Sequence, residues 1–178
     1  MIHKNNIYYF IEQFNKKEIT KLNNKVNIIY RNYKKKHDFK ELLEIKNFCI
    51  KNRRKFYISN NIKIALQLGI NGVYIPSFNK SLEIKYINKK KLEVLGSAHN
   101  FKELSFKIKQ NVDKIFISPI FEISKKNSFL NVIKFNLLSK FTLMDTIALG
   151  GINKKNINKL KMVNCNGFAA IRYFKNEQ

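Results

Sequence analysis

Short apolar runs rich in β-branched residues alternate along this chain with longer amphipathic stretches, and this alternation constrains the fold most strongly. It is typical of βα units, in which helices cover a parallel sheet. Eight such units predict a closed (β/α)8 barrel, and an open doubly wound sheet is the alternative. The predicted strands are Tyr8–Glu12, Val26–Arg31, Lys55–Ser59, Gly72–Ile75, Leu92–Gly96, Lys114–Ser118, Thr146–Gly150 and Gly167–Ile171.

Apolar residues at a spacing of three or four predict the helices between these strands. The 178 residues leave about 22 for each of eight units, so the barrel is compact and residues 1–178 form one domain. Few residues follow the last strand and its arginine, and they end with Lys175–Gln178, so we expect the final helix to be short or missing. The predicted helices are Phe39–Lys51, Ile62–Leu68, Phe101–Lys109, Leu130–Lys140 and Asn156–Met162.

The chain is strongly basic, with 35 Lys and Arg against 12 Asp and Glu and a net charge of +23. This charge is spread along the chain, with +10, +6 and +7 in residues 1–60, 61–120 and 121–178. Nearly all the cations are lysines, whereas base recognition favours the forked guanidinium of Arg. We therefore expect no specific nucleic-acid binding and a general attraction for phosphorylated small molecules.

The apolar runs are far shorter than the roughly 20 residues that a membrane span needs. The first residues also lack the apolar segment of a signal peptide. We expect no membrane association and a cytoplasmic location. Cys49 and Cys165 lie far apart without metal-ligand spacing, so both are expected to be buried small apolar residues.

The ends of the seventh and eighth predicted strands suggest a phosphate site, because barrels commonly bind phosphate there. The seventh strand runs into Gly150 and Gly151, where the backbone can approach a ligand closely and N–H groups precede a helix. The eighth ends at Ile171 and Arg172, which adds a cation at the mouth. An ordinary strand-to-helix turn is the alternative reading of the two glycines.

Polar residues also follow the other predicted strands and would share one rim of a barrel. Arg31 follows the second strand, Asn60 the third and Asn79 the fourth. His99 follows the fifth strand, where it serves either as a helix-capping residue or in acid/base chemistry. Lys126, beyond the sixth strand, is a point charge of the kind that holds a diphosphate.

This ordered set of strand ends resembles the thiamine phosphate synthase/TenI family over nearly the whole chain. The most specific pieces, in order, are Ile58-Ser59-Asn60-Asn61-Ile62, Gly96-Ser97-Ala98-His99, Ser118-Pro119-Ile120-Phe121, Ala148-Leu149-Gly150-Gly151-Ile152 and Gly167-Phe168-Ala169-Ala170-Ile171. The resemblance implies a (β/α)8 TIM barrel that binds thiazole phosphate and an aminopyrimidine diphosphate, with magnesium in the synthase. It also suggests a homodimer.

Carried over by position, the resemblance gives Arg31, His99 and Lys126 as the candidate catalytic residues. The lysine that usually follows the arginine by two residues is Tyr33 here, and Lys34 stands one position further on. The candidate substrate- and phosphate-binding residues are Lys34, Asn60, Ser97, Gly150, Gly151, Ile171 and Arg172.

The two magnesium-binding carboxylates of the synthase pattern fall on Asn60 and Asn79 in this chain. Magnesium prefers carboxylates together with substrate phosphates, and neutral amide oxygens offer it less charge. We therefore expect a weakened magnesium site at these two residues, with lysines sharing its task.

The function that this resemblance implies is thiamine biosynthesis by a transferase. The expected reaction couples hydroxymethylpyrimidine diphosphate with thiazole phosphate, as in thiamine phosphate synthase. The alternatives are a TenI-like thiazole tautomerase with His99 as the acid/base group, and a non-catalytic barrel that binds thiazole phosphate in a regulatory role.

Overall fold

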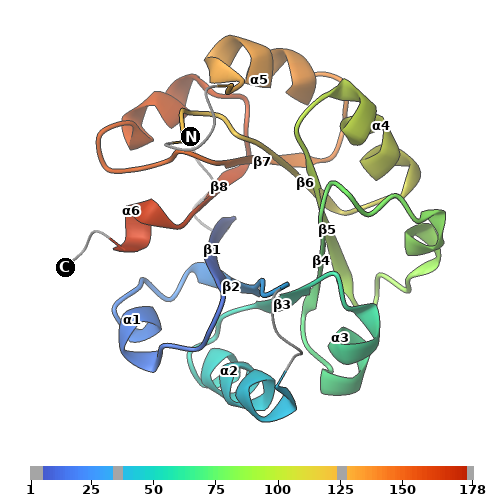
Figure 1. The fold of residues 1–178 in the computed structure, drawn as a ribbon, viewed down its shortest axis with the longest axis vertical. Coiled ribbons are helices and arrows are strands. Elements are labelled where there is room, and N and C mark those ends of the chain that lie inside the picture. The colour runs from blue at the N-terminus through green and yellow to red at the C-terminus, as the bar shows by residue number, and fades with distance from the viewer. Residues whose placement is uncertain (1–5, 34–37, 124–127, 176–178) are drawn as a thin grey trace.

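A computed structural model describes residues 6–33, 38–123 and 128–175 of this chain. Eight parallel strands form a closed barrel in sequence order, and helical segments surround it (Figure 1). The (β/α)8 prediction is confirmed, and the open sheet is excluded because β8 pairs with β1 through Ile7 and Phe168. Lys34 and Lys126, two of the predicted site residues, lie outside the described residues.

Every predicted strand is present, with ends shifted by at most two residues. The largest shift is in β5, which continues beyond Gly96 through Ser97 and Ala98 because these residues pair with Phe116 and Ile117 of β6. The strands are β1 (Ile7–Ile11), β2 (Val26–Tyr30), β3 (Phe56–Ser59), β4 (Gly72–Ile75), β5 (Glu93–Ala98), β6 (Lys114–Ile117), β7 (Asp145–Leu149) and β8 (Gly167–Ala170).

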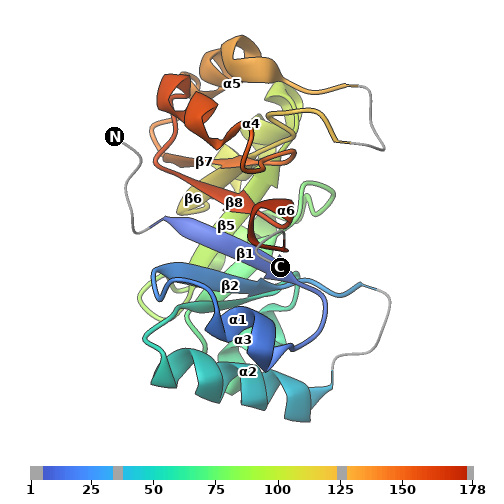
Figure 2. The same cartoon turned by 90° about the vertical axis from the view of Figure 1, so that its left-hand side faces the viewer.

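Side-chain caps fix where the outer helices begin. Asp38, Asn61 and Asn100 each accept a backbone hydrogen bond from the first turn of the following helix. The helices are α1 (Lys16–Thr20), α2 (Phe39–Lys51), α3 (Ile62–Leu68), α4 (Phe101–Lys109), α5 (Asn131–Ser139) and α6 (Arg172–Lys175), with the 3-10 helices η1 (Leu82–Tyr86) and η2 (Ile157–Met162). Seen from the side, α5 and the pair α1 and α2 lie on opposite sides of the barrel (Figure 2).

Three features of the helical layer differ from the prediction. The short helices α1 and η1 were not predicted, since five residues are too few to show a clear period. The predicted helix at Asn156–Met162 is the 3-10 helix η2, which starts at Ile157 and not directly after the two glycines. The final helix is indeed short, and α6 takes up Arg172 because β8 ends at Ala170.

Aromatic side chains fill the inside of the barrel. Tyr8, Phe10, Tyr57, Tyr74 and Phe116 are at most 3% exposed and meet mainly edge to face, with ring centroids 5.0 to 6.2 Å apart. We call these five residues the aromatic plug. It closes the centre of the barrel, so the candidate site must lie above it, at the carboxyl ends of the strands.

A second core lies between the barrel and its helices. Apolar residues such as Leu42 and Ile45 of α2 and Leu104 of α4 pack against the outer faces of the strands. Of the two cysteines, Cys49 is buried in this layer and Cys165 is half-buried. No helix within the described ranges is both long and apolar enough to cross a membrane.

Candidate functional site

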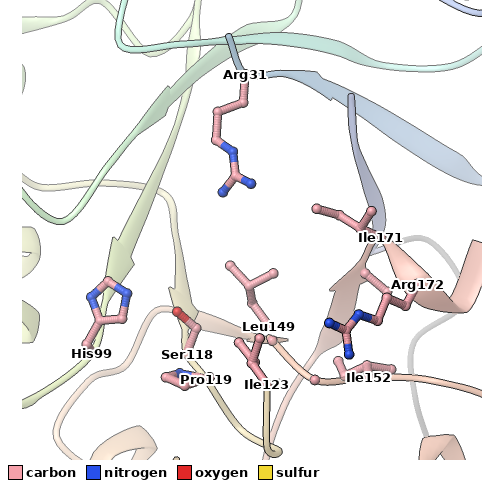
Figure 3. A pocket seen from close by; sticks show the side chains of 12 residues that line it. Arg31, His99, Ser118, Pro119, Ile123, Leu149, Ile152, Ile171 and Arg172 are labelled. Carbon is pink, nitrogen blue, oxygen red and sulfur yellow. The ribbon is translucent and has the colours of Figure 1, made fainter. Parts of the chain in front are cut away.

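A cavity of about 330 Å³ opens at the carboxyl ends of the strands, above the aromatic plug. It brings together side chains from β2, β5, β6, β7 and β8 (Figure 3). Six of the predicted site residues with a described position line it, namely Arg31, His99, Gly150, Gly151, Ile171 and Arg172. Predicted residues from both halves of the sequence therefore meet in one place.

Gly150 and Gly151 form the turn after β7 on one side of this cavity. Their φ angles of +93° and +73° lie in the left-handed region that favours glycine. A Cβ on Gly151 would lie 2.4 Å from the carbonyl oxygen of Phe121, so the turn also packs closely on the segment after β6. Both conformation and packing therefore require glycine here.

The same turn leaves backbone donors beside the cavity. The carbonyl oxygens of Gly150 and Gly151 accept hydrogen bonds from Phe121 N and Asn156 Nδ2. Among the hydrogen bonds of the described residues, none uses the N–H groups of Gly151 and Ile152. Because η2 begins only at Ile157, these N–H groups, and not a helix terminus, are what the turn can offer to an anion.

Two guanidinium groups reach the cavity from different sides (Figure 3). Arg31 follows β2, and its Cζ lies 4.6 Å from the centre of the Phe10 ring in the aromatic plug. This cation–π contact holds the guanidinium at the floor of the cavity. Arg172 begins α6 and lies next to Ile171 and the glycine turn. The cavity thus combines backbone donors with two permanent positive charges.

His99 lines the cavity and is held by Glu103 one turn along α4. Its Nδ1 lies 2.8 Å from Glu103 Oε2, and its backbone N–H donates to the same oxygen at 2.7 Å. Asn100 caps α4 by accepting from Glu103 N. Asn100, and not His99, is therefore the cap of α4. Glu103 holds Nδ1 of the His99 ring, so Nε2 is the remaining ring nitrogen.

Asn60 and Asn79 lie together on the β3 and β4 side of the mouth but do not line the cavity. Asn79 Nδ2 donates to Asn60 Oδ1 at 2.7 Å. Asn79 Oδ1 accepts from Ser81 N at 3.0 Å, which fixes the orientation of that amide. We call these two residues the amide pair.

The amide pair does not fit a magnesium ion. Both side-chain oxygens already accept hydrogen bonds, and neither carries the negative charge that magnesium prefers. In the described part of the chain, no three His, Cys, Asp or Glu side chains lie close enough to share a metal ion. The residues at the predicted metal position therefore do not form a magnesium site.

An aromatic rim lies on the same side of the mouth. Tyr33 stands where the family pattern has a lysine, and its hydroxyl shares a 2.6 Å hydrogen bond with Ser59 Oγ. Its ring meets Phe78 edge to face at 5.7 Å between centroids. Burial raises the pKa of Tyr33, with Ser59 and Arg31 opposing this rise, so the hydroxyl stays neutral at pH 7.

Ser97 is the predicted binding residue that the structure places elsewhere. It is 3% exposed and does not line the cavity. Its position within β5 explains this, because β5 runs two residues further than predicted.

Several cavity residues were not among the predicted site residues. The family resemblance could have identified most of them from the sequence, because they belong to the quoted strand-end pieces. The remaining one, Ile123, lies on the segment after β6, outside those pieces. These residues are Ser118, Pro119, Ile123, Leu149, Ile152 and Ala170.

The fold and the cavity define this chain as a (β/α)8 barrel with its candidate site at the carboxyl ends of the strands. A family model described as "Thiamine monophosphate synthase" (TMP-TENI) matches residues 15–174. The chain therefore belongs to the thiamine monophosphate synthase family, as the resemblance predicts.

Individual relatives agree with this family. A thiamine-phosphate synthase of Prochlorococcus marinus subsp. pastoris is 33% identical over 172 residues, which cover 90% of this chain and 48% of the relative. One from Clostridium perfringens is 26% identical and covers 79% of this chain and 70% of the relative. The chain spans only 39–48% of the Prochlorococcus relatives that it matches.

Solved structures agree on the fold. A thiamine phosphate pyrophosphorylase of Pyrococcus furiosus superposes with a TM-score of 0.71 and 17% identity, over 95% of this chain and 86% of that one. One from Bacteroides thetaiotaomicron gives a TM-score of 0.64 and 16% identity, over 97% and 85% of the two chains. At these identities, the likeness supports the architecture alone.

Proposed function

We propose that this chain couples hydroxymethylpyrimidine diphosphate with thiazole phosphate in thiamine biosynthesis. One structural observation, added to the family membership, supports this proposal. The glycine turn, with its N–H groups, and Arg172 line the same cavity as Arg31, and we call the turn together with Arg172 the phosphate cup. Such a cup suits the phosphate of the thiazole, and Arg31 provides a second place for an anion.

In the proposed reaction, the bond between the pyrimidine methylene carbon and the diphosphate oxygen breaks. The electron pair leaves with the diphosphate, and the thiazole nitrogen donates its own pair to the methylene carbon. Thiamine phosphate and free diphosphate are the products. Because negative charge builds on the leaving diphosphate, positive groups near it lower the barrier.

The described residues divide this task between them. Gly151, Ile152 and Arg172 hold the thiazole phosphate, which fixes the ring and its nitrogen. The apolar side chains of Leu149 and Ile171 exclude water from the space between the two substrates. Arg31 faces the leaving diphosphate from the cavity floor, and Lys34 and Lys126 are further candidates outside the described residues.

A second candidate function is proton transfer on a thiazole phosphate, as in a tautomerase. The position of His99 favours it, because the ring lines the cavity while Glu103 holds Nδ1 at 2.8 Å. A carboxylate in this place orients the imidazole and supports it as a base. The phosphate cup would serve this reaction equally well.

The proposed partners are phosphorylated small molecules, and their phosphates suit the positive mouth. A homodimer is proposed from the family resemblance. The cytoplasmic location likewise stays a prediction from the sequence.

Product formation from the two purified precursors tests the proposal. We expect thiamine phosphate, detected by mass spectrometry, and at least a tenfold lower kcat/KM for the pyrimidine diphosphate in Arg31→Met. Arg53→Met is the matched control, since this exposed arginine lies before β3 at the opposite end of the barrel. Thiazole isomerisation without coupling would instead support the second candidate, and binding without any turnover would contradict both.

A further inference from the structure

The ammonium group of Lys107 is buried between α4 and the loop of residues 76–81 that follows β4. Lys107 is 0% exposed, and its Nζ donates to Pro76 O and Asn79 O at 2.8 Å and to Gln110 Oε1 at 2.9 Å. None of the ion pairs found among the described residues involves it. Burial lowers its pKa to about 8, with Glu103 opposing this shift. Its three hydrogen bonds all go to oxygen acceptors, which uses all three N–H groups of an ammonium.

Holding the loop in place does not require this charge. Gln110 Nε2 already donates to Asn79 O at 3.0 Å and to Ser81 O at 2.8 Å. Lys107 follows the buried Leu104 by three residues, on the side of α4 that faces the barrel, where an apolar residue would normally stand. Burying a charge without a carboxylate partner costs free energy, and a function that requires the charge would account for it.

Asn79 connects Lys107 to the amide pair, of which it is a member. The backbone oxygen of Asn79 contacts the ammonium, while its side chain donates to Asn60 Oδ1. Asn60 is held at the end of β3 by a 2.8 Å hydrogen bond from its N–H to Tyr74 O. The hydrogen bond between the two side chains uses one hydrogen of Asn79 Nδ2, so within the described residues its second hydrogen and both hydrogens of Asn60 Nδ2 remain as N–H donors that the pair can offer to an anion.

We propose that Asn60, Asn79 and Lys107 form a diphosphate subsite that works without a divalent cation. The amide N–H groups of Asn60 and Asn79 bind the anion, and Lys107 is a positioning residue that fixes Asn79 and supplies positive charge beneath it. The assignment of this diphosphate to the pyrimidine substrate rests on the proposed function.

The amide pair interacts with a diphosphate in the opposite way to a pair of carboxylates. Carboxylates repel a diphosphate and bind it only through a bridging cation. Amide N–H groups attract it directly, and the internal ammonium takes over the charge that the bridging cation would bring. Relative to the family pattern, the two neutral asparagines replace the carboxylates, and the buried lysine replaces the charge of the bridging cation.

Calorimetric titration with inorganic diphosphate, in EDTA and in magnesium, tests this subsite. We expect the wild-type chain to bind in EDTA, with a Kd that changes less than threefold in magnesium. Lys107→Met should weaken this binding at least tenfold while leaving thiazole phosphate binding within twofold. A merely structural loss would weaken both ligands, and this outcome would overturn the role of Lys107. Lys102→Met is the matched control on the exposed side of α4.

A second variant keeps the proposal testable if Lys107→Met does not fold. In Asn60→Asp combined with Asn79→Asp, carboxylates replace the donors, so diphosphate binding in EDTA should fall at least tenfold and recover in magnesium. Undiminished binding of this variant in EDTA, or a wild-type chain that binds only in magnesium, would overturn the subsite.

These measurements also separate the subsite from the proposed coupling reaction, because binding of inorganic diphosphate needs no turnover. Binding as expected without thiamine phosphate formation refutes the coupling and keeps the subsite. Formation of product with diphosphate affinity indifferent to Lys107 and the amide pair refutes the subsite and keeps the coupling.

Discussion

On the β7 and β8 side of the mouth, the cavity is lined by the backbone of the glycine turn and by Arg172. The β3 and β4 side instead carries side-chain amides beside an aromatic rim. A substitution cannot remove a backbone donor as long as the turn keeps its shape. Side-chain donors, in contrast, change with every replacement. In this chain, Gly150 and Gly151 match the family pattern, whereas Tyr33, Asn60 and Asn79 on the opposite side depart from it.

The two sides are also held in place differently. The glycine turn packs on backbone atoms of residues 119–122, so its position depends on main-chain contacts. The amide pair depends on Lys107 and Gln110, two side chains of a neighbouring helix. We therefore expect changes on the two sides to have separable effects on the two ligands.

The largest expected effect is on stability, and it comes from a residue at the opposite end of the barrel. This effect should not distinguish the two sides of the mouth. Glu93 accepts hydrogen bonds from Lys114, Tyr57 and Lys55 at 2.7, 2.7 and 3.0 Å. Burial alone would raise its pKa, but these donors outweigh burial and lower the pKa to about 2. Replacing Glu93 by Gln leaves Lys114 without its partner and should lower the free energy of unfolding at pH 7 by about 2–3 kcal/mol.

The sign of the pH dependence follows from the lowered pKa of Glu93. Its contribution is complete above the ordinary carboxyl pKa of about 4.5 and is lost as the pH falls toward 2, because the folded state resists protonation. Urea unfolding of both chains between pH 7 and pH 3 measures this. The difference between them should shrink in acid, and Glu83→Gln on the exposed part of η1 is the control. A constant difference would show that Glu93 does not act through its charge.

Gly151→Val should break the glycine side alone. The added Cβ would lie 2.4 Å from Phe121 O, so the turn must move. We expect thiazole phosphate binding to weaken at least tenfold, about 1.4 kcal/mol, with diphosphate binding within twofold. Gly69→Val has a similar positive φ but open space around its Cβ, so it controls for backbone strain. Unchanged thiazole phosphate affinity in Gly151→Val would place the phosphate elsewhere.

A smaller effect is expected on the opposite side. Tyr33→Phe removes the hydrogen bond with Ser59 and keeps the ring against Phe78. Diphosphate affinity should fall about two- to threefold, roughly 0.5 kcal/mol, while thiazole phosphate affinity stays the same. The exposed Tyr86 of η1 provides the matched control Tyr86→Phe, and calorimetry measures all four values. An equal loss for both ligands would contradict the separation of the two sides.

Much of the fold could be predicted because local signals agree with it. The helices Phe39–Lys51, Ile62–Leu68 and Phe101–Lys109 match the structure at both ends, since a capping Asp or Asn precedes each of them. The strand ends located the cavity, because parallel strands in a barrel bring their carboxyl ends to one rim.

The contacts that distinguish this chain could not be predicted in the same way. A lysine on α4 is normally taken as exposed, and only the packing of the loop after β4 shows that Lys107 is buried. The contact of Tyr33 with Ser59 joins residues 26 apart, and nothing in the local pattern marks it. Likewise, Asn60 and Asn79 were placed at a metal site by position, whereas their hydrogen bonds decide what they can bind.

The aromatic plug has a kinetic consequence for any reaction in this barrel. Since its five buried rings leave no passage along the barrel axis, the mouth is both entrance and exit. Two ligands that bind side by side there must therefore arrive and depart in turn through one opening. Under the proposed coupling, the larger product covers the route of the smaller one, so the order of release, and with it the inhibition by each product, is decided at the rim.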